Sequence, residues 1–267
     1  MIKPRALKSG DRVAVVAPAS PFDRAEFALG LDEVRRLGFE PVFDDRVFAA
    51  ARYVAGPPEA RAEAIRSAWR DPTIAAVLCV RGGYGSVQIL PYLDQSEARA
   101  ARKAFVGYSD LTSVLTFLSC GCGLVCFHGP TVAGRLSAGE DGYDRTSLLG
   151  ALTRTEPLGE LSPAGVEVLR PGEARGLLLG GTLTQLVGSI GTPFAFNPPD
   201  RFILFVDEVG ERPYRVDRMW TQLVLSGLLA RASAIVFGEL PQCDEPGGDP
   251  AARAVVADLV AGFPGPV

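Results

Sequence analysis

Histidine is the scarcest chemically active residue in this sequence, because His128 is the only one among 267 residues. Cysteines are also few: there are five, an odd number in a long chain without an export signal, which indicates reduced thiols rather than a disulfide framework. The spacing of Cys120 and Cys122 is too short for the usual zinc knuckle, and His128 does not complete a ligand set. We therefore expect no metal ion and no cofactor, and we interpret the cysteines as small buried hydrophobic residues.

Long apolar runs and blocks of like charge are absent as well. No stretch reaches the roughly 20 apolar residues of a membrane-spanning helix, since the longest candidate, residues 111–127, is interrupted by Gly121 and Gly123. Residues 1–11 carry charges and no apolar segment with a cleavage site, so they are not a secretory signal. The net charge of −4 comes without a basic cluster, which argues against nucleic acid as a partner. These absences predict a cytoplasmic protein that contacts neither membrane nor nucleic acid.

The composition is that of a globular protein, with 47% hydrophobic and 22% charged residues. Short apolar runs of strand length alternate with segments of helical periodicity in the first half of the chain, which predicts parallel βαβ units in an α/β fold. The expected strands are residues 12–17, 39–43, 74–80, 104–107 and 124–127, and the expected helices are residues 23–37, 57–69 and 110–119.

The second half of the chain has a different pattern. Residues 135–168 show scattered Gly, Pro, Ser and Glu with weak periodicity, which indicates a connection between domains. We predict an α/β domain over residues 1–140, a linker over 141–172 and a smaller domain of β and α elements over 173–267. The last expected helix, residues 251–261, is followed by a Gly/Pro-rich loop with no closing strand, so we expect the chain to be cut short. Further elements are expected at residues 202–206 and 234–237 (strands) and 216–228 (helix).

Ser109 is the first candidate for chemistry. The segment Gly107-Tyr108-Ser109-Asp110 follows a short apolar strand and opens a helix, a geometry that exposes a serine hydroxyl beside free helical N–H groups. It lacks the second glycine of the usual Gly-x-Ser-x-Gly turn. The alternative interpretation is a structural N-cap, a role that serine often fills.

The second candidate is the glycine-rich segment of residues 81–85, Arg-Gly-Gly-Tyr-Gly, which follows a buried strand. Its glycines permit positive φ angles and close backbone approach, and its consecutive N–H groups can hold an anion or a developing oxyanion. A plain tight turn and a phosphate site are alternatives. A dinucleotide site is disfavoured, because Gly83-Tyr84-Gly85 supplies only half of the required glycine pattern.

Asp207 and Glu208 form the third candidate, at the end of an apolar strand. Adjacent residues of a strand face opposite sides, so at most one of these carboxylates points into a given site. A carboxylate there is suited to orienting a histidine in a Ser-His-acid system. The alternative is a pair of surface acids that form ion pairs with nearby arginines; these are Arg212, Arg215 and Arg218.

Taken together and in this order, the motifs resemble the LD-carboxypeptidase family, which also contains the microcin-immunity peptidases. The likeness covers nearly the whole chain. The matching segments are residues 13–20 (VAVVAPAS), 81–85 (RGGYG), 107–110 (GYSD), 127–130 (FHGP), 179–192 (LGGTLTQLVGSIGT) and 203–218. The resemblance implies a flavodoxin-like N-terminal domain, a smaller C-terminal domain, an active site between them and a homodimer.

The resemblance also implies an activity and its residues. Family enzymes use serine, histidine and glutamate to release a C-terminal D-amino acid from an L–D peptide bond, usually D-alanine from the murein tetrapeptide in cell-wall recycling. The serine matches Ser109, and the oxyanion hole is expected from the N–H groups of Asp110 and Gly83. The glutamate position matches Asp207, with Glu208 beside it as the alternative.

The family's catalytic histidine has no match in this chain. It is expected in a Gly-His pair beyond the Gly-Phe-Pro loop at residues 262–264, and His128 matches a different position. The expected function is a serine carboxypeptidase acting on murein peptides. The alternatives are a microcin-immunity-type peptidase, disfavoured by the short segment at residues 213–215, and a non-catalytic muropeptide-binding protein.

Overall fold

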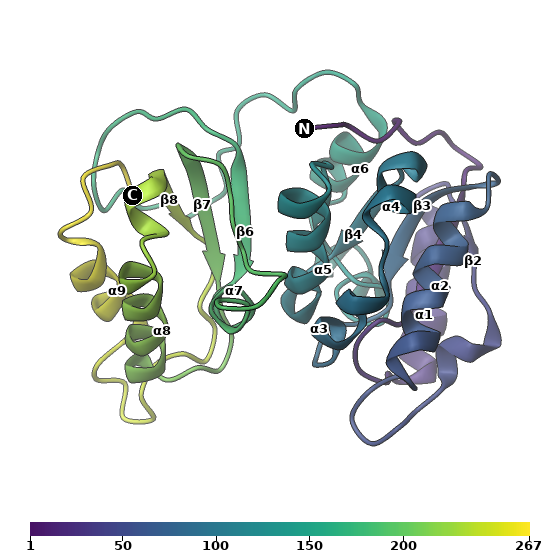
Figure 1. Cartoon of the computed structure of the whole chain (residues 1–267), viewed down its shortest axis with the longest axis horizontal. Coiled ribbons are helices and arrows are strands. Elements are labelled where there is room, and N and C mark those ends of the chain that lie inside the picture. Colours follow the sequence, from purple (N-terminus) through teal and green to yellow (C-terminus); the bar gives the residue numbers. More distant parts are fainter. The chain divides into compact units, whose positions relative to one another are not determined.

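The computed structural model describes residues 1–267, which form two compact units, Met1–Leu161 and Ser162–Val267 (Figure 1). Each unit has its own parallel β-sheet with helices packed against it, which confirms the expected α/β class. No helix combines the length and the apolar character needed to cross a membrane.

The sheet of the first unit has five parallel strands in the order β2-β1-β3-β4-β5. This is the flavodoxin-like order. The third strand is buried along its whole length, as a central strand covered on both faces must be. The strands are β1 (Arg12–Val16), β2 (Glu40–Val42), β3 (Ile74–Cys79), β4 (Ala104–Gly107) and β5 (Phe127–His128).

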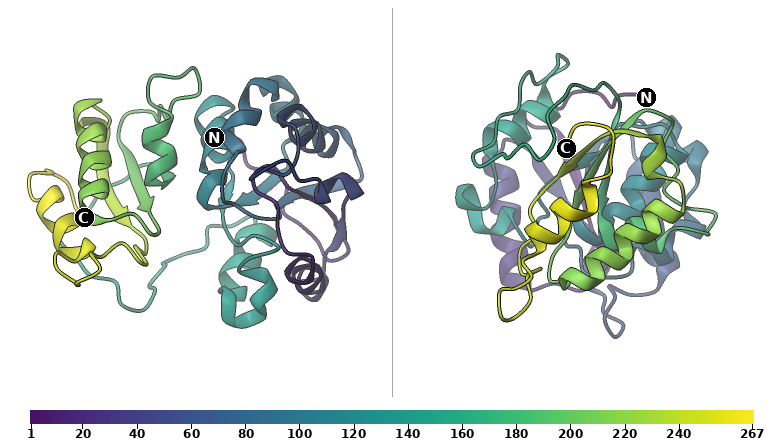
Figure 2. Two further views of the ribbon diagram at one scale, coloured as in Figure 1. Left: turned by 90° about the horizontal axis from the view of Figure 1, so that it is seen from below. Right: turned by 90° about the vertical axis from the view of Figure 1, so that its left-hand side faces the viewer.

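Helices cover both faces of this sheet, with α1 and α6 on one face and α2 to α5 on the other (Figure 2, left). The first helix begins where the Asp23 carboxylate accepts hydrogen bonds from the N–H groups of Ala25 and Glu26, which satisfies donors that the helix itself leaves unpaired. The helices are α1 (Arg24–Arg36), α2 (Pro58–Arg70), α3 (Ser86–Ile89), α4 (Gln95–Ala101), α5 (Thr112–Thr116) and α6 (Arg145–Thr153).

The helix α6 lies within the stretch that the sequence analysis assigned to a connection. Its Leu148 and Leu152 belong to the hydrophobic core of the first unit. Just before it, the Tyr143 hydroxyl donates a hydrogen bond of 2.6 Å to the buried carboxylate of Glu33 on α1. This return of the chain onto the first sheet was missed because the helix has only nine residues and lies between stretches of weak periodicity.

Two sequence-based boundaries near the nucleophile segment need correction. The strand expected at residues 124–127 is confined to Phe127–His128, because Leu124 pairs with Ile2 instead of with β4. The helix expected at residues 110–119 consists of a 3₁₀ turn (Ser109–Leu111), α5 and a π turn (Phe117–Gly121).

The second unit is a three-stranded parallel sheet in the order β6-β7-β8. The central strand alternates buried and partly buried residues. Helix α8 lies between α7 and α9 (Figure 2). Its Trp220 is fully buried. The elements are β6 (Leu178–Thr182), α7 (Leu183–Gly188), β7 (Phe202–Asp207), α8 (Pro213–Leu225), β8 (Ala232–Phe237) and α9 (Ala252–Val260).

Glycine is required at one point of the second sheet. The φ angle of Gly180 is +145°, and a Cβ atom placed there would lie 1.9 Å from the carbonyl oxygen of Phe205 on the neighbouring strand. The family-matching segment of residues 179–192, for which no elements were expected, therefore contains most of β6 and all of α7, and Gly180 allows the close approach to β7.

The packing of α6 gives a test of the first unit. Leu152→Ala should lower the free energy of unfolding by about 2–4 kcal/mol, since it removes a side chain that is 4% exposed and leaves a cavity. Leu161→Ala is the control, because that side chain is 66% exposed. Calorimetric unfolding would measure both. Equal stability of the two variants would contradict the inclusion of α6 in this core.

Candidate active site

Ser109 stands at a sharp turn between β4 and the helix that follows. Tyr108 is extended, with φ −151° and ψ −177°, and Ser109 has a φ angle of +62°. A non-glycine residue in this left-handed region costs about 1–3 kcal/mol and is retained where the surroundings enforce it, often at functional sites. Tyr108, and not Ser109, holds the N-cap position, so the structural N-cap interpretation is wrong.

The glycine-rich loop lies directly against this turn. A Cβ atom at Gly82 would lie 3.0 Å from Cβ and 3.1 Å from Oγ of Ser109, which is closer than side chains normally pack. Gly83 has a φ angle of +99°, and a Cβ there would lie 2.5 Å from Oγ of Ser20. Glycine is therefore required at residue 83, while a side chain at residue 82 would need its neighbours to shift by a few tenths of an ångström. The backbone of Gly82 thus lies directly beside the Ser109 side chain.

Ser20, which follows β1, holds the other side of this loop. Its N–H donates to the carbonyl oxygen of Gly82 at 3.3 Å, and its hydroxyl accepts a hydrogen bond of 3.0 Å from the N–H of Tyr84. The same hydroxyl donates to the carbonyl oxygen of Tyr53 at 2.9 Å. The loops after β1, β3 and β4 thus meet at the carboxyl edge of the sheet, where ligands bind in folds of this kind.

Asp110 is buried beneath the turn at Ser109, with 2% of its surface exposed. Its Oδ2 accepts a hydrogen bond of 2.8 Å from the N–H of Ser86, and the Ser86 hydroxyl donates to the Asp110 carbonyl oxygen. Burial raises the pKa of the Asp110 carboxyl, while hydrogen bonds from Ser86 and Gly85 and the charge of Arg61 lower it. The Asp110 N–H lies in the first turn of a helix, where backbone donors have no intrahelical acceptor.

The two acids at the end of β7 point to opposite faces of the sheet. Oδ1 of Asp207 accepts a hydrogen bond of 2.8 Å from the hydroxyl of Thr182, its partner in the neighbouring strand. Oε2 of Glu208 accepts hydrogen bonds from the N–H (2.8 Å) and the hydroxyl (2.7 Å) of Thr184 in the first turn of α7. Glu208 is 4% exposed, and burial raises the pKa of its carboxyl, although the Thr184 hydroxyl lowers it.

The interpretation of these acids as a surface pair is therefore wrong. Two of the three nearby arginines pair with other acids, since Arg212 contacts Glu245 at 3.5 Å and Arg215 contacts Glu211 at 3.2 Å. Glu208 serves as a buried cap for α7, which leaves Asp207 as the acid on the other face.

His128 lies at the carboxyl end of β5, beside β4. It pairs in register with Gly107, and its ring centroid is 5.9 Å from that of Tyr108. The five cysteines are free thiols. No group of three or more His, Cys, Asp or Glu side chains is arranged to hold a metal ion.

Comparison with known proteins agrees with this arrangement. Residues 13–129 match the model of the LD-carboxypeptidase N-terminal domain, and residues 175–267 match that of the LD-carboxypeptidase C-terminal domain. The chain belongs to the LD-carboxypeptidase family. It is therefore a peptidase, and the family resemblance read from the sequence motifs is confirmed.

Several relatives of this chain are named as carboxypeptidases. One of them, from Streptomyces coelicolor, is 36% identical over all of this chain and 86% of its own length. The murein tetrapeptide carboxypeptidase of Pseudomonas aeruginosa is 34% identical over 87% of this chain and 77% of its own.

Solved structures share the fold over nearly the whole chain. The muramoyltetrapeptide carboxypeptidase of Oxalobacter formigenes, 27% identical, superposes with a TM-score of 0.82 over 96% of this chain and 86% of its own. The microcin self-immunity protein MccF bound to glutamyl sulfamoyl guanosine, 23% identical, gives a TM-score of 0.89 over 100% and 89%, which supports the fold alone.

Several residues that support the site escaped the sequence analysis. Ser20, Ser86 and Thr184 are polar residues of common type, and nothing in the local pattern marks them. The spacing of Arg61 could have indicated its burial. It lies four residues before Ile65 and eight before Trp69, on the buried face of α2. A charged residue on the apolar face of a helix indicates that its side chain has a specific hydrogen-bond partner in the interior.

The burial of Asp110 predicts a pH dependence of stability. The folded protein keeps the Asp110 proton to a higher pH than the unfolded chain, whose ordinary pKa is 3.8. Between these pKa values the folded state binds more protons, so the stability that neutral Asp110 contributes is complete below 3.8 and is lost as the pH rises through the folded pKa. Asp110→Asn should thus gain stability relative to the parent between pH 4 and pH 7.

Chemical unfolding across that pH range would measure this difference. Asp141→Asn is the control, because the Asp141 side chain is exposed. A constant difference between Asp110→Asn and the parent at all pH values would show that burial does not govern this carboxyl.

Proposed function

We propose that this protein is a serine-type LD-carboxypeptidase that converts the murein tetrapeptide to the tripeptide and D-alanine. The observation that carries the proposal is the turn at Ser109: a serine with φ +62° packed against a glycine loop. Glycine would adopt this φ angle without strain, so packing alone does not explain a serine here. The turn directs the serine hydroxyl out of the helix.

In the proposed reaction, Ser109 Oγ attacks the carbonyl carbon of the L–D peptide bond and gives up its proton to a base. The N–H groups of Asp110 and Gly83 are proposed to bind the resulting oxyanion. The C–N bond then breaks, and the proton passes to the nitrogen of the leaving D-alanine. A water molecule hydrolyses the acyl-enzyme by the same route, which releases the tripeptide and restores the serine.

A serine hydroxyl is a poor nucleophile unless a base lies beside it. The family resemblance implies a histidine for this step, with Asp207 holding its ring in the productive tautomer. Asp207 is favoured over Glu208 because Glu208 is buried, with its carboxylate bonded to Thr184 at the start of α7, whereas Asp207 is only partly buried. His128 follows a strand of the first unit and matches a different position in the family pattern, so we do not assign it this role.

The biological setting is proposed by the same resemblance: cell-wall recycling in the cytoplasm, by a homodimer. The alternative substrate is a peptide–nucleotide amide of the kind that microcin-immunity peptidases cleave. Sequence identity favours the murein peptide, since it is 34% to the Pseudomonas aeruginosa murein enzyme and 26% to MccF of Escherichia coli. A non-catalytic muropeptide-binding role is the third candidate, and the next experiment separates it from the others.

The test is release of D-alanine from the murein tetrapeptide by the protein expressed from its full coding region. Ser109→Ala should lower kcat by at least about 10³-fold, because the nucleophile is lost while peptide binding remains. His128→Gln should keep kcat within about threefold of the parent. Normal turnover by the serine variant would refute the nucleophile assignment, and loss of turnover in His128→Gln would make His128 the base.

The two acids should respond differently to substitution. Asp207→Asn should lower kcat by about 10³–10⁴-fold with little change in KM, since an amide stabilises the wrong histidine tautomer. Glu208→Gln should mainly lower the melting temperature, because it weakens the cap of α7. Kinetics and calorimetry on both variants measure this. An active Asp207→Asn together with an inactive Glu208→Gln would transfer the catalytic role to Glu208.

A further inference from the structure

Arg61 on α2 is a buried arginine that serves the loops at the carboxyl edge of the first sheet. Its side chain makes four hydrogen bonds, all to uncharged oxygens. Nε donates to the carbonyl of Gly56 at 3.0 Å, Nη1 to the carbonyls of Pro18 (2.6 Å) and Gly85 (2.8 Å), and Nη2 to the side-chain oxygen of Gln88 (2.6 Å). The residue is 3% exposed, so it is not available to a substrate.

The three carbonyls belong to three different loops, which follow β1, precede α2 and follow β3. Burial lowers the pKa of Arg61, which means that the site holds this cation at an unfavourable desolvation cost. A guanidinium is a rigid planar fork with donors in fixed directions. Its four hydrogen bonds therefore form together only when the three loops adopt one mutual arrangement.

The loop after β3 connects Arg61 to the nucleophile. While Arg61 holds the carbonyl of Gly85, the N–H groups of Gly85 and Ser86 donate to the carboxyl of Asp110, the residue that follows Ser109. The charge of Asp110 in turn acts on Arg61. Residues 82–86 are thus fixed between the arginine on one side and the nucleophile turn on the other.

We propose that Arg61 is a positioning residue of the catalytic site: it sets the backbone of the Gly82–Gly85 loop so that the Gly83 N–H meets the oxyanion. This inference rests on the proposed function, in which Gly83 is an oxyanion donor. Arg61 touches neither the substrate nor Ser109 and acts through the loop.

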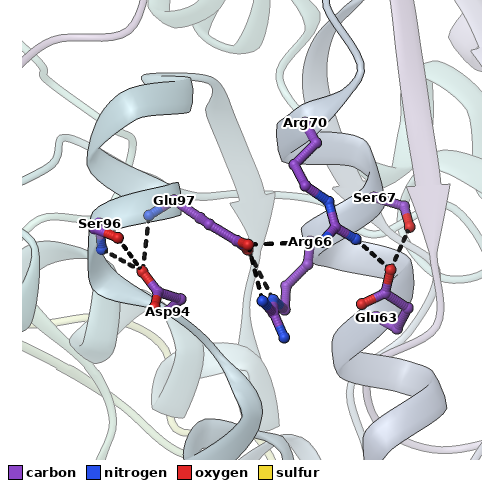
Figure 3. A network of polar contacts seen from close by, with 7 residues as sticks. All are labelled: Glu63, Arg66, Ser67, Arg70, Asp94, Ser96 and Glu97. Carbon is purple, nitrogen blue, oxygen red and sulfur yellow. Dashed lines mark hydrogen bonds and ion pairs between the residues drawn. The ribbon is translucent and has the colours of Figure 1, made fainter.

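A second arginine on the same helix provides a matched control. Arg66, five residues further along α2, makes two parallel hydrogen bonds of 2.7 and 2.8 Å to the Glu97 carboxylate on α4 (Figure 3). The neighbouring pair of Arg70 and Glu63 lies in the same network (Figure 3). The Arg66 contact joins α2 to α4, the Arg70–Glu63 pair lies within α2, and neither pair involves the loops that Arg61 contacts.

The first measurement is steady-state release of D-alanine by Arg61→Lys, Arg61→Ala and Arg66→Lys. A lysine keeps the charge, but its single nitrogen cannot span the carbonyl of Gly56 and the side chain of Gln88. We expect Arg61→Lys to lower kcat about 10–100-fold with KM within about threefold, because an oxyanion donor acts in the transition state. Arg66→Lys should stay within about twofold of the parent in both constants.

Two further readouts separate positioning from general loss of structure. Added methylguanidinium should restore part of the kcat of Arg61→Ala, because it can occupy the vacated volume and donate to the same carbonyls. Amide hydrogen exchange of residues 81–86 should be faster in Arg61→Lys than in the parent or in Arg66→Lys. If Arg61→Ala does not fold, Arg61→Lys carries the test alone.

The outcomes distinguish this inference from the proposed function. A parent protein that releases no D-alanine would refute the function, while the exchange rates of residues 81–86 would still test the hold of Arg61 on the loop. Parent-like kcat and parent-like exchange in Arg61→Lys would overturn the positioning role. So would a variant in which KM alone rises, since that would place Arg61 in substrate binding.

Discussion

The close approach of the Gly82 backbone to Ser109 is the constraint on which the rest of the site depends. It arises because β3 and β4 are parallel neighbours, with Leu78 paired to Val106, so that the chain leaves both strands at the same edge. A side chain at residue 82 would push the two turns apart. The fold therefore brings the loop and the serine together, and the absence of a side chain allows them to touch.

The polar groups around this contact bind the glycine loop from its sides and do not lie between Gly82 and Ser109. Ser20 binds the loop from the β1 side, Arg61 from α2 and Asp110 from beneath the serine. Each of these groups makes a hydrogen bond to main-chain atoms of residues 82–86, so the loop is held through its own backbone. Such a loop presents its N–H groups in a set orientation, which a preorganised oxyanion site requires.

Much of this arrangement could be predicted from the sequence, and the reasons for the rest are physical. The buried strands β1, β3, β4 and β7 were expected because each is a continuous apolar run bounded by turn residues. The glycines at residues 82 and 83 were recognised because they follow such a run and permit positive φ angles and close backbone approach. The helix α6 was not, since its place was decided by packing of Leu148 and Leu152 against distant residues.

Side-chain direction was the other limit of the sequence. Alternation along β7 predicted that Asp207 and Glu208 diverge, but not which one would be satisfied internally, because that depends on Thr184 at the start of the next helix. Likewise, the inward face of α2 could be inferred from periodicity, whereas the three carbonyls that receive Arg61 come from loops with no common pattern. The positive φ of Ser109 could not be expected for a residue other than glycine.

That positive φ has an evolutionary consequence. Serine and glycine codons can differ by one nucleotide, and glycine adopts the left-handed conformation without the strain that serine bears. Under the proposed function, a change of Ser109 to glycine would remove the nucleophile and also relax the backbone at that point, while the residues of the sheet, the glycine loop and the Arg61 contacts stay the same. Drift at this one codon would then lead toward a more stable protein that no longer cleaves its substrate, and selection for turnover would be needed to keep the hydroxyl in place.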